Sequence, residues 1–467
     1  MITISLENRS GSPLYEQIYA HIRREIESGR LPAGAKLPSK RKMADHLKVS
    51  LRTVENAYAQ LMVEGYVESF EKKGYVVCLS ERPPVKPNCP AGRAKGLKPA
   101  LKPATHCRFD LKTNRINKGD FPFSIWTKLM RSSLRDDSSA LLEPVHPQGD
   151  PELRLEIVKY LRQFRSMEVE PDQVIIGAGT EYLIGLVTEL LSGQTFAVED
   201  PNYHKPAKIF ASRRVDFVTV PLDDEGLRLD CLGKTMATAV LVSPSHHFPL
   251  GTVMSVNRRR QLIHWAAQKK ERYLIEDDYD SEFRFALKPV PPLHSLDGQN
   301  KVIYMNTFTR SLAPSLRIAY LVLPPDLLDR YRRSLMFYSC TVSEIEQCTL
   351  WRFMRDGFYE RHLSRIRKIY RDRRDGLLRG LSHLSEVMDI KGQEAGLHLL
   401  LTSKKGGSDE RLVRMAGKKG VKVYALSGYY LKPEAKTATV IAGYAGYDVA
   451  DLDTIASLLT EAWLKSP

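Results

Sequence analysis

The sequence predicts a multidomain protein with a small, mostly helical N-terminal domain, a large α/β domain and a smaller α+β domain at the C-terminus. A chain of 467 residues is too long for one domain of roughly 100 to 200 residues. Residues 82–108 hold six prolines and seven Lys or Arg but no acid, a composition typical of a linker. Beyond them, short β-rich segments alternate with helical stretches, which indicates a largely parallel sheet.

We therefore predict four regions. They are a small N-terminal domain over 1–80, a linker over 81–108, a large domain over 109–325 and a small C-terminal domain over 326–467. The prolines of the linker disfavour helix and central strand, and favour an extended tether. Its basic residues could contact phosphates, but a solvated tether needs a similar composition, and we favour the tether.

Composition excludes several classes of protein. Hydrophobic residues make up 43% and charged residues 27%, an ordinary globular balance, while the formal net charge of +15 favours a polyanionic partner. There is no apolar run of about 18 residues and no signal-peptide pattern, so we expect a cytoplasmic protein without a membrane partner. The six cysteines form no C-x-x-C pair, and we expect reduced thiols and no metal.

Each element of the N-terminal domain has its own signal. Apolar residues at helical spacing over 13–28 predict the first helix. Ser39 and Ser50 are good N-caps for a second and a third helix, and Gly65 ends the third. The strand-like segments 66–70 and 75–79 predict a hairpin. Three helices and a hairpin in this order predict a winged helix-turn-helix.

In a helix-turn-helix the start of the second helix of the motif meets base edges, and flanking groups hold phosphates. These positions predict contacts to double-stranded DNA from Arg52, Thr53 and Asn56 to bases, and from Ser39, Lys40, Arg41, Lys72 and Lys73 to the backbone. Residues 1–80 hold only 12 basic against 9 acidic residues, so charge alone would not indicate DNA binding. The order of elements carries the prediction: residues 13–77 closely resemble the DNA-binding domain of GntR-type regulators. The tip Glu71-Lys72-Lys73-Gly74 departs from the Gly-x-Gly usual in that family.

Three segments of the large domain carry chemical information together. In QVIIGAGTEYLIGLV a strand enters a glycine turn before a helix, where backbone N–H groups can bind a phosphate. In RYLIEDDYDSEF Asp277 ends a strand, with Tyr279 two residues later. In VIYMNTFTRSLAPSLRIAYLV hydroxyls and guanidiniums follow a strand and could bind an anion. Each segment alone also fits an ordinary turn, a solvated acid or a structural ion pair.

These segments, in this order with EDPNYHKPAK and SPSHHFPLG between them, resemble the fold type I aminotransferase domain, which binds pyridoxal 5′-phosphate. Behind a GntR-type reader, the architecture resembles MocR/GabR-family regulators over nearly the whole chain. The resemblance implies a homodimer and a small-molecule effector, with Lys205 near a basic effector contact. It implies cofactor contacts from Gly179, Thr180, Tyr203, Asp277, Tyr279, Thr307, Thr309, Arg310 and Arg317.

Arg310 is the main departure from the family. It stands where the resemblance places the lysine that forms the Schiff base with the cofactor. A guanidinium stays protonated and is no usable nucleophile. We therefore expect no catalytic residue and no transaminase activity, and a non-covalent cofactor if one binds.

A second departure lies near the C-terminus. The pattern there expects an arginine for a substrate carboxylate, but the chain has KTATVIAGYAGY, with Lys436 as the nearest cation and Ala438 and Ile441 unable to bind a carboxylate. The leading hypothesis is a transcription regulator whose aminotransferase-like domain senses an effector and dimerises. The alternatives are a pyridoxal-phosphate enzyme with a DNA-binding appendage and a dimerisation scaffold with an empty pocket.

Overall fold

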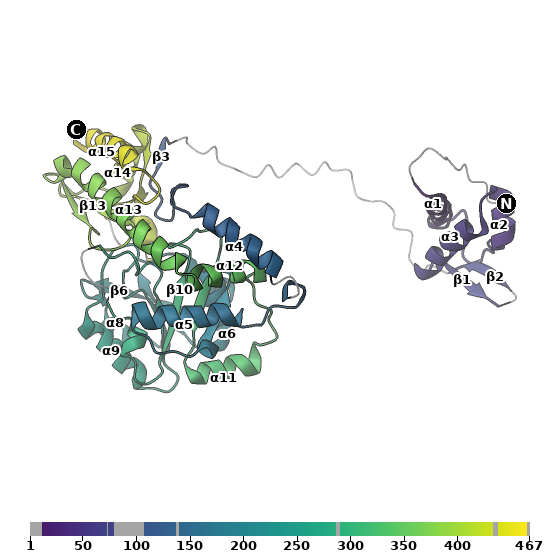
Figure 1. Ribbon diagram of the computed structural model, residues 1–467, viewed down its shortest axis with the longest axis horizontal. Coiled ribbons are helices and arrows are strands. Elements are labelled where there is room, and N and C mark those ends of the chain that lie inside the picture. The colour runs from purple at the N-terminus through teal and green to yellow at the C-terminus, as the bar shows by residue number, and fades with distance from the viewer. Residues whose placement is uncertain are drawn as a thin grey trace. The chain divides into compact units, whose positions relative to one another are not determined.

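The computed structural model describes residues 12–71, 73–78, 107–136, 140–285, 290–432 and 438–464. The chain divides into two compact units, Met1–Ala104 and Thr105–Pro467, shown in Figure 1. Residues 81–106 of the predicted linker, which include Cys89, lie outside the described ranges, as do Lys72, Leu79 and Lys436. None of the described helices is both long enough and apolar enough to cross a bilayer.

The N-terminal unit has the predicted three helices and hairpin. They are α1 (Leu14–Glu27), α2 (Lys40–Leu47), α3 (Leu51–Val63), β1 (Val67–Phe70) and β2 (Gly74–Val77). The side chains of Ser39 and Ser50 accept the backbone N–H groups of Lys42 and Thr53, which confirms both predicted caps. β1 and β2 pair antiparallel from Val67 opposite Val77 to Phe70 opposite Gly74.

The second unit is built on an eight-stranded sheet in the order β4-β11-β10-β9-β8-β5-β6-β7. β10, β9, β8, β5 and β6 run parallel, whereas β11 is antiparallel to both of its neighbours and β7 is antiparallel to β6. The strands are β4 (Val174–Gly177), β5 (Phe196–Asp200), β6 (Phe217–Asp223), β7 (Gly226–Leu227), β8 (Ala239–Val242), β9 (Tyr273–Asp277), β10 (Val302–Thr307) and β11 (Ala319–Val322). The residues of β4, β5, β8, β10 and β11, and all but the last of β9, are buried, as expected for a sheet covered by helices on either side. In β6, next to the edge strand β7, only Val220 is buried.

Helices cover both faces of this sheet. Ile175 packs in one core with α6 and α11, and Ile176, its neighbour, packs in another core with α5 and α12. The helices are α4 (Phe123–Asp136), α5 (Pro151–Arg165), α6 (Thr180–Leu190), α7 (Lys205–Ser212), α8 (Leu229–Leu232), α9 (Val256–Ala267), α10 (Leu293–Leu296), α11 (Pro325–Ser334) and α12 (Glu344–Arg355). α11 packs on α6, and α12 on α4 and α5, so both lie with the large sheet although the predicted small domain begins at residue 326.

The C-terminal part forms a four-stranded antiparallel sheet in the order β12-β13-β16-β15. It comprises α13 (Phe358–Gly380), β12 (Met388–Lys391), β13 (His398–Ser403), α14 (Asp409–Lys418), β14 (Val421–Lys422), β15 (Tyr424–Ala425), β16 (Thr439–Gly443) and α15 (Val449–Leu464). β3 (Phe109–Asp110) pairs with β14, so the start of the predicted large domain contributes to this part instead. Figure 1 shows β3 beside the C-terminal helices α14 and α15.

The long helix α13 buries one of its many arginines. Arg373 is 4% exposed and donates to both carboxylate oxygens of Asp120, at 2.5 and 3.0 Å. A buried charge requires such a partner, because an unpaired one would lose its hydration without compensation. Arg373 therefore anchors α13 to the segment before α4.

Candidate functional site

The phosphate end of the predicted pocket lies where three neighbouring strands end. Thr307 on β10 stands opposite Ala319 on β11, which stands opposite Gly177 on β4. Gly179 has φ +86° and precedes α6, and the guanidinium of Arg317 occupies the space that a Cβ at this position would take. Glycine is favoured here chiefly because residues with a Cβ rarely adopt this backbone conformation.

The two threonine hydroxyls of this region lie together. Oγ1 of Thr307 is 2.7 Å from Oγ1 of Thr309. The backbone N–H of Thr309 also donates a hydrogen bond to Oγ1 of Thr307. The strand ends therefore bring together the glycine turn with Thr180, the threonine pair and Arg317. This set offers backbone N–H groups, hydroxyls and a guanidinium, the donors that bind phosphates in proteins.

The ring end of the pocket contains a buried, unsatisfied carboxylate. Asp277 ends β9, and its Oδ1 is buried without a hydrogen-bond partner. Burial, followed by the charges of Asp278 and Asp280, raises the pKa of Asp277 to about 7, while Arg310 opposes the rise. An unsatisfied buried carboxylate costs stability, so it marks a position that a cationic or N–H group of a ligand can fill.

Arg310 faces this end of the pocket. Its guanidinium carbon is 5.7 Å from the centroid of the Tyr279 ring, and Nη1 donates to the backbone oxygen of Thr113. The Tyr279 hydroxyl lies 3.1 Å from Nδ1 of His246. The cation is therefore held over an aromatic ring, within electrostatic reach of Asp277.

Tyr203, the predicted ring-stacking residue, has 43% of its surface exposed, so we place it at the mouth of the predicted pocket. Its ring centroid lies 6.2 Å from that of Phe248, which lies 5.2 Å from that of Tyr429 in the C-terminal part. The ammonium of Lys205 lies 5.5 Å from the Tyr203 ring centroid. Aromatic side chains from both parts thus form one wall.

Sequence reasoning missed a buried histidine cluster in SPSHHFPLG. Nδ1 of His246 is 2.9 Å from Oδ2 of Asp280, and its Nε2 is buried without a partner. Nε2 of His247 lies 3.7 Å from Oε2 of Glu199. Burial lowers the pKa of His247 to about 3 and raises that of Glu199 to about 8, so this pair is largely uncharged at neutral pH. The adjacent histidines in the sequence were the available signal.

The packing of β16 agrees with the absence of a carboxylate-binding arginine from the C-terminal segment KTATVIAGYAGY. Ile441 is fully buried beside Leu400 and Leu426, and it pairs with Leu400 across the sheet. It offers no donor to a carboxylate.

Some of the side chains predicted to contact DNA are exposed, and others already make hydrogen bonds within the N-terminal unit. Arg52, Asn56, Arg41 and Lys73 are exposed. The hydroxyl of Thr53 lies 2.7 Å from that of Ser50, and the ammonium of Lys40 donates to Glu55 at 3.1 Å and lies over the Tyr75 ring. Ser39 is exposed but its hydroxyl caps α2. Lys40, Thr53 and Ser39 therefore also have structural roles.

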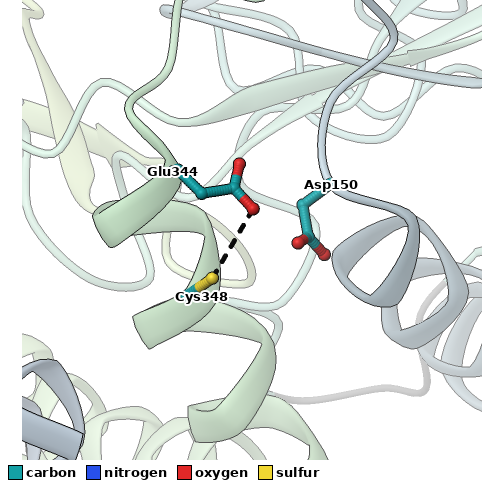
Figure 2. Close-up of side chains that lie close together, drawn as sticks. All are labelled: Asp150, Glu344 and Cys348. Atoms are coloured by element: carbon teal, nitrogen blue, oxygen red, sulfur yellow. Dashed lines mark hydrogen bonds between the residues drawn. The ribbon is translucent and has the colours of Figure 1, made fainter. Parts of the chain in front are cut away.

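One cluster elsewhere brings potential metal ligands together. Figure 2 shows Asp150, Glu344 and Cys348, whose ligand atoms lie within 4.8 Å of one another. Asp150 already caps α5 through Leu153 N–H, and the Cys348 thiol lies 3.7 Å from Glu344. These contacts at the starts of α5 and α12 account for the closeness of the three side chains without a metal ion.

Comparisons with known proteins agree with this geometry. Residues 14–77 match the bacterial regulatory proteins of the gntR family, and residues 112–456 match aminotransferase class I and II. The HTH-type transcriptional regulator YdeL of Bacillus subtilis is 38% identical over 99% of both chains. The probable rhizopine catabolism regulatory protein MocR of Rhizobium meliloti is 31% identical over 98% of this chain and 95% of its own.

Solved structures show the fold of the second unit. The multiple substrate aminotransferase of Thermococcus profundus superposes with a TM-score of 0.70 at 23% identity, covering 80% of this chain and 95% of that one. The chain therefore belongs to the MocR/GabR-type regulators, in which a GntR-family winged helix-turn-helix precedes a domain of aminotransferase class I and II.

Proposed function

We propose that this protein is a dimeric transcription regulator that binds an operator through its N-terminal unit and a phosphorylated effector through its aminotransferase-like domain, without catalysis. The observation that carries the proposal is Arg310. It occupies the position of the Schiff-base lysine while the surrounding anion and ring contacts remain. A pocket that keeps its binding groups and lacks its nucleophile can bind a ligand but cannot perform covalent catalysis.

Pyridoxal 5′-phosphate fits the residues present. Gly179, Thr180, Thr307, Thr309 and Arg317 would hold the phosphate. When bound, this cofactor supplies an electron sink for chemistry at an amino acid.

The ring contacts are separate from the phosphate contacts. The free Oδ1 of Asp277 would accept the proton of the ring nitrogen, and Tyr203 would pack on the ring face. Tyr279, which already contacts His246, would direct its hydroxyl to the ring oxygen. Each hydrogen bond to a charged group contributes roughly 1.5 to 3 kcal/mol, enough for reversible binding.

The test uses purified full-length protein and pyridoxal 5′-phosphate. We expect binding by calorimetry, no incorporation after borohydride treatment, and no transamination. Arg310→Lys should restore the amine, so the variant should become yellow and should retain the cofactor after borohydride, as mass spectrometry would show. Borohydride trapping of the native protein at a pocket lysine would contradict the proposal and favour an enzyme. Absence of binding by both proteins would show a pocket for another ligand or an empty scaffold.

A further inference from the structure

Glu181 lies between two cations at the phosphate end of the pocket. It is the second residue of α6, and its side chain is 28% exposed. Oε2 accepts a hydrogen bond from Nη2 of Arg317, and Oε1 accepts one from Nζ of Lys205. A single carboxylate thus engages the guanidinium beside the glycine turn and the lysine beside Tyr203.

The guanidinium of Arg317 lies against the glycine turn, while 43% of the side chain is exposed. It packs against Gly179, and Nη2 also lies 3.4 Å from the oxygen of Ala178. The backbone of Arg317 has φ +55°, a left-handed conformation that few non-glycine residues adopt. A ligand anion that binds at the turn must therefore share Arg317 with Glu181, or displace Glu181 from it.

We propose that Glu181 is a specificity-determining residue, an internal anion that a ligand must displace from Arg317 and Lys205 by means of a dianionic phosphate. The inference rests on the proposed function, in which this pocket binds a phosphorylated ligand. A monocarboxylate would exchange one carboxylate for another with no gain in charge. A phosphate monoester carries about −1.5 to −2 charges at pH 7 and three acceptor oxygens, so it competes successfully.

Displacement of Glu181 has a second consequence, at Lys205 on the neighbouring helix α7. Lys205 loses its carboxylate partner when Glu181 leaves, and its ammonium stays over the Tyr203 ring at the mouth of the pocket. It then becomes available to a further anionic group of the ligand. Phosphate binding thus releases the Lys205 ammonium for a hydrogen bond to a second anionic group of the ligand.

The experiment measures the affinity of the full-length chain for pyridoxal 5′-phosphate and for pyridoxal, which lacks the phosphate. The variants are Glu181→Gln and, as matched control, Glu189→Gln. Glu189 lies on the same helix, is 31% exposed and pairs with Arg213 at 2.6 Å, away from the turn. Thermal melting of each protein without ligand verifies that it is folded.

We expect Glu181→Gln to lower the Kd for pyridoxal 5′-phosphate by roughly 3- to 30-fold, because the competing charge is gone. Glu189→Gln should leave this Kd unchanged, and neither variant should alter the Kd for pyridoxal. Equal or weaker binding by Glu181→Gln, while the native protein binds, overturns the role of Glu181 and leaves the proposed function intact. Absence of binding by all three folded proteins refutes the proposed phosphorylated effector and the inference with it.

Discussion

Replacing Asp277 with asparagine should stabilise the aminotransferase-like domain at alkaline pH. In the unfolded chain this carboxyl ionises near its ordinary pKa of 3.8, whereas burial raises the folded value to about 7. The folded state therefore binds more protons between these values, and stability falls as pH rises through them. The difference corresponds to at most about 4 kcal/mol above pH 7. Asp277→Asn removes this penalty.

The assay is urea unfolding of cofactor-free protein at pH 5 to 8, followed by tryptophan fluorescence. The gain in free energy of unfolding should grow with pH and be full at pH 8. Asp230→Asn is the control, because the hydrogen bond from Arg228 lowers the pKa of this exposed carboxyl to about 2, and its loss should give no such gain. An Asp277→Asn protein that is less stable than the native protein at pH 8 would refute the reasoning.

The other predictions concern DNA and assembly. Arg52→Ala should lose about 1 to 3 kcal/mol of discrimination at one operator position, whereas Lys73→Ala should weaken binding to all DNA sequences alike. Titrations with operator and random DNA distinguish these results. An equal loss of affinity for both DNAs in Arg52→Ala would contradict a base contact from Arg52. Residues 109–467 should sediment as a dimer. Paired operator half-sites require a dimeric protein, and the N-terminal unit uses its apolar side chains for its own core, so we expect the second unit to form the dimer interface. A monomeric 109–467 with a dimeric reader would reverse this prediction.

The places of three candidate site residues in the fold could be predicted, because each lies at the end of a strand or in the turn that follows one. Asp277 closes β9, Thr307 closes β10 and Gly179 opens α6, and strand ends of one sheet meet at one edge. The roles of these residues remain predictions. The pairing of β3 with β14 could not be foreseen, because two-residue strands have no periodic pattern.

The sequence by itself determined the order of the two units and the elements of the winged helix-turn-helix, because capping residues and local periodicity are encoded along the chain. It also places an arginine at position 310, where the family resemblance implies a Schiff-base lysine. Only the tertiary structure decided that Glu181 joins Arg317 to Lys205, that His246 pairs with Asp280 and that Arg373 is buried. These pairs join residues 24 to 253 positions apart. Their formation depends on which side chains the packed sheet and helices bring within hydrogen-bond distance, and no local pattern encodes that.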